Sequence, residues 1–163
     1  GFLLLAQRRW LEFHREVSTG KNVVYCRGLH APIKNVAIGK PIFCVMTNNT
    51  PHHVYLWGTY LGSEITPISD AWRLFGPSLG AASEREWNEL VSSIESLRQA
   101  KAFAAVRIGN VSSPSTTIPL AKAKVEIRTS PKGRSLRGEE VQRLLAALNE
   151  AVALTILSAT TIC

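Results

Sequence analysis

Short apolar runs and stretches of helical spacing alternate along the first part of the chain. The run FLLLA (2–6) is apolar throughout and predicts a buried strand. In QRRWLEFHREV the apolar side chains recur at helical spacing from Trp10 to Val17, which predicts a short amphipathic helix ending near Gly20. NVVYC (22–26) is rich in β-branched residues and predicts a second strand.

The next segment has the pattern of a β-hairpin. The turn GKP (39–41) leads into PIFCVMT, NNTP supplies turn residues, and HHVYLWGTYLGSEI returns as a second strand. We therefore expect a hairpin over 41–65. Gly58 interrupts the second strand, which predicts a β-bulge or the close approach of another backbone.

Two further helices and two strands follow. Ser83, with Glu86 three residues later, forms a capping box at the start of the helical pattern SEREWNELVSSIESL (83–97). AFAAVRIGNV predicts a strand, and IPLAKAKVEI predicts a strand or a short turn. The strongest helical pattern is EEVQRLLAALNEAVALTIL (139–157), whose expected buried stripe comprises Val141, Leu144, Leu145, Leu148, Ala151, Val152 and Ile156.

This order of elements predicts an α+β fold. Helices and strands do not alternate regularly, so a doubly wound parallel sheet is excluded, and a mostly antiparallel curved sheet or small barrel with helices packed around it fits better. A length of 163 residues suits one domain, 1–163. The opening Gly1 and the abrupt start in a strand pattern suggest a domain taken from a longer chain.

The charge balance suggests a polyanionic partner. The net charge is +7 and the sequence pI about 9.7, as expected for a protein that binds nucleic acid or an anionic membrane, the alternative being an ordinary basic surface. No apolar run reaches the ~20 residues that span a bilayer, so no membrane insertion is expected.

The cysteines and histidines predict neither a disulfide framework nor a metal site. The three cysteines, Cys26, Cys44 and Cys163, form no CxxC pair, which is typical of reduced thiols in the cytoplasm. The four histidines do not fall at zinc-site spacing with them, so no metal and no cofactor are expected.

Basic residues concentrate in the segment before the last helix. RTSPKGRSLR (128–137) contains no acid and includes Lys132, Arg134 and Arg137. A basic loop beside a folded domain contacts phosphates well, because each neutralised phosphate releases counterions. The alternative is a loop that only increases solubility.

Aromatic residues gather in the second strand of the hairpin. Tyr55 and Trp57 share one face by the two-residue period of a strand, whereas Tyr60 lies on the other face unless a bulge at Gly58 resets the register. The two rings are either core residues or the wall of a pocket that stacks a planar base. Each such stacking contact contributes roughly 1–3 kcal/mol.

No motif of phosphate-loop, serine-hydrolase or zinc-hydrolase type occurs, so we do not expect an enzyme. An acid–base pair for a small nucleotide-directed hydrolase, the enzymatic alternative, could come only from the following residues: His14, His52 or His53 with Glu12, Glu16 or Glu64.

Several of these segments together resemble the EVE-type branch of the PUA-like superfamily, whose relatives include the YTH, SRA and ASCH domains. The similar segments are FLLLA, RRW, VVYCRG, VAIGKPIFCV, VYLWGTYLGSEI, AFAAVRIGNV, IPL and EEVQRLLAAL, over most of 2–150. The resemblance implies a pseudo-barrel with helices packed around it that places a modified base in an aromatic-lined pocket. The chain departs from the family pattern at Lys40, where an acid is usual, at Gln7-Arg8, and at Tyr25, where many relatives have tryptophan.

The resemblance and the basic charge together predict a nucleic-acid-binding protein without catalytic activity. It would recognise a modified, flipped base, in DNA rather than RNA, and serve a modification-dependent restriction system beside a nuclease domain in the full chain. The implied binding residues are Gln7, Arg8, Tyr25, Arg27, Tyr55, Trp57, Lys132, Arg134 and Arg137. The alternatives are an RNA-binding PUA-like domain and a protein-interaction module that uses the apolar end AVALTILSATTIC.

Overall fold

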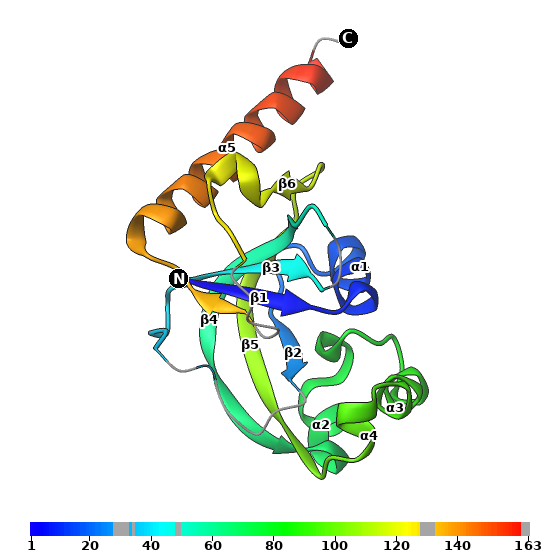
Figure 1. The fold of residues 1–163 in the computed structure, drawn as a ribbon. Helices are drawn as coiled ribbons and strands as arrows, with labels where there is room; N and C mark the ends of the chain where they lie inside the picture. Colours follow the sequence, from blue (N-terminus) through cyan, green and yellow to red (C-terminus); the bar gives the residue numbers. More distant parts are fainter. Residues whose placement is uncertain (28–32, 34, 48–49, 128–132, 161–163) are drawn as a thin grey trace.

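The computed structural model describes residues 1–27, 33, 35–47, 50–127 and 133–160 (Figure 1). A curved sheet forms the centre, and helices pack around it. The strands are β1 (Phe2–Ala6), β2 (Val23–Arg27), β3 (Pro41–Met46), β4 (His53–Pro67), β5 (Ala102–Ser112), β6 (Ile118–Pro119) and β7 (Arg134–Ser135). The helices are α1 (Arg8–Val17), α2 (Ile68–Phe75), α3 (Glu84–Ser93), α4 (Glu95–Arg98) and α5 (Gly138–Thr160), with short 3-10 turns η1 (Gly76–Leu79) and η2 (Leu120–Ala123).

The sheet confirms the α+β class and the mainly antiparallel pairing. Its strand order is β2-β5-β4-β3-β1-β7, with β6 beside β4, and β1–β3 is its one parallel pair in the described part of the chain. The path is open, because β2 and β7 end it and are not hydrogen-bonded to each other. The sheet is therefore curved but not a closed barrel.

The predicted hairpin is confirmed, and its second strand is bent as expected. β4 pairs antiparallel with β3 and, along most of its length, with β5. The β4–β5 register shifts between Trp57 and Thr59, and a Cβ on Gly58 would lie 2.6 Å from the carbonyl oxygen of Gly109. Gly58 is thus required both for the bulge and for the close approach of β5.

Three groups of buried side chains hold the fold together. The central core fills the concave side of the sheet and includes Leu4, Trp10, Leu56, Tyr60 and Ile108. The α5 core joins the sheet to α5, β6 and η2, and it contains Leu3, Phe43, Val54, Leu144 and Leu148. The α3 core lies under α2, α3 and α4 and contains Val24, Leu79, Trp87, Leu97 and Phe103.

The predicted helix over 83–97 begins as expected but is interrupted. The Ser83 side chain accepts a hydrogen bond from the Glu86 amide at 3.3 Å, and the Glu86 carboxylate accepts one from the Ala82 amide at 3.0 Å. The helix then breaks at Ile94, whose φ of −99° and ψ of 108° are extended, so α3 and α4 are separate helices. The break turns Leu97 into the α3 core.

Segment 118–127, expected as a strand or a short turn, forms a two-residue strand followed by a short 3-10 turn. Only Ile118 and Pro119 pair with β4, and η2 follows at once. Proline at the second position has no N–H for the ladder, which limits the strand. Lys124 then takes a left-handed conformation with a φ of 51°, which ends η2.

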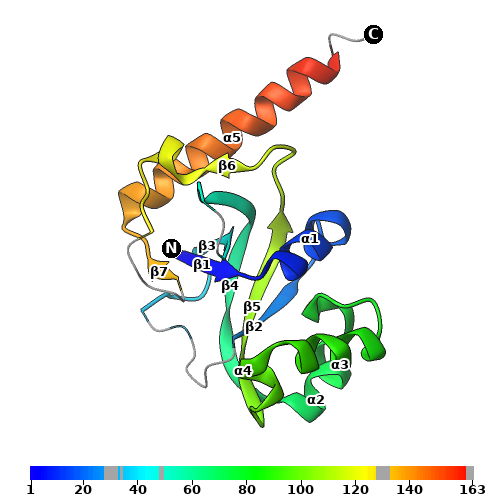
Figure 2. The same cartoon turned by 45° about the vertical axis from the view of Figure 1, so that its right-hand side comes forward.

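The terminal helix is confirmed, and so is the described part of its buried stripe. Leu144, Ala147 and Leu148 are buried, and Val141 and Leu145 pack beside them. Val152 and Ile156 lie outside the residues whose side chains are described. Figure 2 shows the last turns of α5 extending away from the sheet. Within the described residues, no helix has both the length and the apolar character that a bilayer span requires.

Candidate nucleic-acid interface

The end of β2 carries two of the expected binding residues, Tyr25 and Arg27. The Tyr25 ring meets the Trp10 ring edge-on, with centroids 5.0 Å apart, and the Trp10 indole donates to the Val24 carbonyl at 3.0 Å. Burial raises the pKa of Tyr25 to about 12, and the backbone amide of Gln7 opposes this shift. The neutral Tyr25 phenol and Gln7 therefore lie together where β1 ends and α1 begins.

Arg27 is a half-buried cation beside two phenols. Burial lowers the pKa of Arg27, while Tyr25 and Tyr60 favour its charged form. The Tyr60 hydroxyl lies 2.9 Å from the Ser63 hydroxyl, which also accepts a hydrogen bond from the Ile33 amide at 3.1 Å. A half-buried guanidinium and a pair of hydrogen-bonded hydroxyls are thus available in this part of the fold, and donors of this kind can bind acceptor-rich ligands.

A second group of basic and aromatic residues lies along α1. The Arg15 guanidinium carbon is 5.8 Å from the centre of the Tyr55 ring, within the range of a cation–π contact. The pKa of Arg8 is raised chiefly by its hydrogen bond to Glu12 and the charge of Glu12, and to a smaller extent by Tyr55. Arg8 and Arg15 are two turns apart and so share one face of α1.

A surface cleft of about 540 Å³ adjoins this second group. Its walls come from Arg15, Glu12 and Glu16 of α1 and from 113–115, the segment after β5. Arg15 fixes one side of the cleft, because its guanidinium donates to the Pro114 carbonyl at 3.4 Å.

Trp57 does not join these aromatic residues, and the prediction that it shares a face with Tyr55 is wrong. Trp57 packs against the α5 core, whereas Tyr55 packs against the central core on the other side of the sheet. The reason is a bulge: in the β3–β4 ladder Cys44 pairs with Leu56 but Val45 pairs with Val54, which leaves Tyr55 as an extra residue. A single cavity walled by Tyr25, Tyr55 and Trp57 is therefore not formed.

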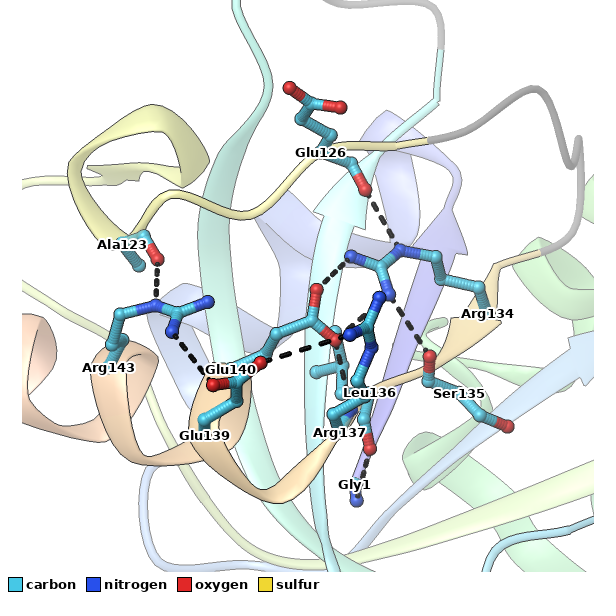
Figure 3. A network of polar contacts seen from close by, with 10 residues as sticks. All are labelled: Gly1, Ala123, Glu126, Arg134, Ser135, Leu136, Arg137, Glu139, Glu140 and Arg143. Carbon is cyan, nitrogen blue, oxygen red and sulfur yellow. Dashed lines mark hydrogen bonds and ion pairs between the residues drawn. The ribbon is translucent and has the colours of Figure 1, made fainter.

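The basic residues before α5 lie at β7, away from both the end of β2 and the α1 group. β7 and β2 form opposite ends of the strand order. The Arg134 guanidinium binds the Glu140 carboxylate through two nitrogens, at 2.6 and 3.1 Å, and donates to the Glu126 carbonyl at 2.8 Å (Figure 3). Arg137 is exposed, and Lys132 lies outside the described residues.

Ser63 was not singled out from the sequence, and Arg15 and Tyr60 were noted as a basic and an aromatic residue but not assigned to the site. Arg15 had a usable signal, since it follows Arg8 by seven residues on a predicted helix and so shares its face. The face of the sheet on which Tyr60 lies was predicted to depend on the register of β4. Ser63 carried no local sequence signal, because its contact with Ile33 joins residues far apart in the chain.

His14, a candidate acid–base residue, is fully buried. It packs edge-on against Trp10 and Phe13, and its Nδ1 lies 2.7 Å from the Ser18 hydroxyl. Burial lowers the pKa of His14 from 6.5 to about 4, so the ring is neutral at pH 7. This histidine is a core residue that cannot reach a substrate.

We expect the burial of His14 to make the fold acid-sensitive. The unfolded chain takes up a proton near pH 6.5 and the folded chain only near pH 4, so stability is lost as the pH falls through this window. The free energy of unfolding should drop by about 3 kcal/mol between pH 7 and pH 4. Denaturant titrations of the wild type and His14→Gln at several pH values measure the effect.

His14→Gln should lose that part of the pH dependence, whereas His53→Gln should keep it. His53 is the matched control because its ring is only half buried and binds Thr117 at 3.0 Å. An unchanged pH profile in His14→Gln would contradict the assignment of the loss to this residue.

Comparison with known proteins identifies the fold. No protein-family model and no curated protein sequence matches the chain. Three crystal structures of the ASCH protein ZmASCH from Zymomonas mobilis do match. A tyrosine-to-phenylalanine variant has a TM-score of 0.63 at 16% identity, covering 89% of this chain and 96% of that one. A serine-to-alanine variant has a TM-score of 0.60 at 14% identity, covering 89% and 94%. The unsubstituted protein has a TM-score of 0.57 at 16% identity, covering 89% and 93%. The chain therefore shares the fold of ZmASCH at low sequence identity.

Proposed function

We propose that this protein binds nucleic acid and recognises one base at the end of β2, without catalysing a reaction. The observation that carries the proposal is the half-buried guanidinium of Arg27 at the end of β2, within electrostatic range of Tyr25 and Tyr60. A base offers carbonyl and ring-nitrogen acceptors to a guanidinium and a π-face to an aromatic ring. Where water is excluded, such hydrogen bonds are stronger than at an open surface.

The charge of the protein and the residues of α1 support the same proposal. A net charge of +7 attracts a polyanion. Arg8 is an exposed cation and Arg15 a partly exposed one stacked over Tyr55, both in the helix that begins directly after Gln7. Phosphates bound along α1 would hold the strand, while the groups at Arg27 would read the base.

The specific target in this proposal is a modified base flipped out of duplex DNA. The sequence resemblance to EVE-type domains implies such a target, and the fold shared with ZmASCH is consistent with the architecture that this resemblance implies. The protein would act as the recognition component of a restriction system, with cleavage supplied by a neighbouring nuclease. RNA recognition is the alternative that the binding experiment separates.

The test is the loss of binding in Arg27→Gln. This substitution removes the charge while keeping a hydrogen-bonding side chain of similar length. If Arg27 donates to the base, the affinity for a DNA duplex with one 5-methylcytosine should fall about 10- to 100-fold, the value of a charge-assisted hydrogen bond. Fluorescence anisotropy should be measured on this duplex, on the unmodified duplex and on an RNA of the same sequence.

The control variant is Arg73→Gln on α2, whose side chain is 71% exposed and, among the described residues, pairs with Asp70 alone, at 3.3 Å. It should bind all three probes like the wild type. The base-recognition proposal fails if Arg27→Gln binds the modified duplex as well as the wild type does, or if it weakens modified and unmodified duplexes equally. Preferential loss of RNA binding would replace DNA by RNA as the target.

A further inference from the structure

A cavity of about 300 Å³ lies between η2 and the first turns of α5, and charged side chains line it. Its four cations are Lys124, Arg134, Arg137 and Arg143, and its three anions are glutamates. The residues at the end of β2 do not take part in it. It is therefore separate from the base site proposed above.

Two of these charges neutralise each other and form a wall of the cavity. Arg134 and Glu140 make a short two-point ion pair, and their side chains are only 23% and 11% exposed. Glu140 also accepts a hydrogen bond from the Arg137 amide at 2.9 Å. With these bonds made, neither side chain offers charge to a ligand.

The other two arginines are held loosely by one shared carboxylate. Arg137 and Arg143 each lie 3.9 Å from a different oxygen of Glu139, which is longer than a hydrogen bond (Figure 3). Glu139 is 63% exposed, so it can turn into solvent at little cost. Arg143 is oriented independently of Glu139, because its Nε donates to the Ala123 carbonyl at 2.8 Å.

Positive charge exceeds negative charge among the groups that remain. Lys124 is exposed and makes no ion pair with any residue in the described part of the chain. Figure 3 shows the Glu126 carboxylate pointing away from Arg137 and Arg143, toward the outside. With Arg134 and Glu140 paired, three cations and two glutamates remain in the lining, and of these glutamates only Glu139 lies near Arg137 and Arg143.

We propose that this cavity binds a phosphoryl group between Arg137, Arg143 and Lys124. A phosphoryl group has several acceptor oxygens on a tetrahedron, and guanidinium forks donate to two of them at once. The bound anion takes the place of Glu139 as the acceptor shared by both arginines, with short hydrogen bonds in place of the 3.9 Å contacts. Lys124 adds a third positive charge.

The inference rests on the proposed function only for the molecule that carries the phosphoryl group. If the protein binds nucleic acid, the group is a backbone phosphate or a terminal phosphate of the bound strand. The binding of a free phosphate ion does not require the base site. The two proposals can therefore fail separately.

The first experiment is a titration of the protein with inorganic phosphate. Binding is measured by isothermal titration calorimetry and by NMR of the arginine side chains. The wild type should bind saturably at one site. Arg137→Gln and Arg143→Gln should each weaken binding about 10-fold or more, the value of a lost charge-assisted hydrogen bond. Glu139→Gln should strengthen binding several-fold, because the competing internal anion is removed.

The control is Arg85→Gln on α3. Arg85 is 89% exposed and pairs with Glu89 one helical turn away, so it matches Arg143 and Glu139 in spacing but lines no described cavity with other cations. It should leave phosphate binding unchanged. The expected gain in phosphate affinity of Glu139→Gln separates a lost site from a misfolded variant, because damage to the structure would not tighten phosphate binding.

The site is overturned if the wild type shows no saturable binding, if both arginine variants bind phosphate normally, or if Glu139→Gln does not gain affinity. Oligonucleotides with and without a 5′-phosphate identify the source of the group. A defect of Arg143→Gln on the phosphorylated strand alone assigns the site to a terminal phosphate, and an equal defect on both strands assigns it to the backbone. Phosphate binding without oligonucleotide binding would keep the site and reject the proposed function.

Discussion

Replacing Leu148 by alanine is expected to lower the free energy of unfolding by about 2–5 kcal/mol. The side chain is completely buried in the α5 core, where Leu3, Phe43 and Leu144 also lie. Alanine removes apolar contacts and leaves a cavity that the rigid sheet cannot fill, and both losses add to the cost. Chemical denaturation followed by circular dichroism gives the change from the shift in midpoint at constant slope.

Leu74→Ala is the matched control for this measurement. Leu74 lies on α2 and is 52% exposed, so the same change in volume should alter stability by no more than about 0.5 kcal/mol. A loss in Leu148→Ala no larger than in Leu74→Ala would mean that α5 does not belong to the folded unit. The expected loss would instead show that the terminal helix covers one face of the sheet as part of the fold.

Most of the fold could be predicted from local pattern, because local physics decides those elements. The hairpin of β3 and β4 followed from two apolar runs around a turn, and the capping box at Ser83 fixed the start of α3. The stripe from Val141 to Leu148 identified the buried face of α5. In each case the residues that determine the element lie within a few positions of one another.

The errors arose where contacts between distant segments decide the structure. The helix from Ser83 breaks at Ile94, and the break lets Leu97 pack in a core that also contains residues of β2 and β5. α2 was not predicted, although Ile68, Ala71, Trp72 and Phe75 recur at helical spacing and pack in the α3 core. The bulge at Tyr55 arises from the pairing register of β4 with β3, and no residue type in the sequence indicates it.

The candidate site was predicted in part for the same reason. Tyr25 and Arg27 are two residues apart on one strand, so their common location followed from the sequence. Tyr60 comes within electrostatic range of Arg27 only because β4 and β2 both pair with β5. Trp57 was assigned to the wrong side, because a single extra residue reverses the facing of every side chain beyond it.

Removing the Arg134 guanidinium is expected to cost about 3–5 kcal/mol at pH 7. In Arg134→Met the largely buried Glu140 carboxylate keeps only the Arg137 amide as a hydrogen-bond donor among the described residues. A buried charge that loses its partner is strongly destabilising, whereas the aliphatic stem of methionine preserves most of the packing. Urea unfolding at pH 7 measures the loss.

The control for this variant is Arg85→Met. Arg85 and Glu89 form an ion pair of similar length, 3.1 Å, but their side chains are 89% and 57% exposed. An exposed pair contributes about 0–1 kcal/mol, so this variant should remain close to the wild type. Equal effects of the two substitutions would contradict a structural role for Arg134.

The pH dependence gives the same pair a second and independent test. The hydrogen bond from Arg134 is the main cause that lowers the pKa of Glu140 from 4.5 to about 2. The folded state therefore keeps this carboxylate ionised longer than the unfolded chain does, and stability falls by about 3 kcal/mol as the pH drops from 4.5 to 2. Arg134→Met should lose most of this dependence, while the loss caused by His14 between pH 6.5 and 4 should persist. A variant that is destabilised at pH 7 and flat between pH 4.5 and 2 would establish that Arg134, within the most basic stretch of the sequence, stabilises the junction of β7 and α5.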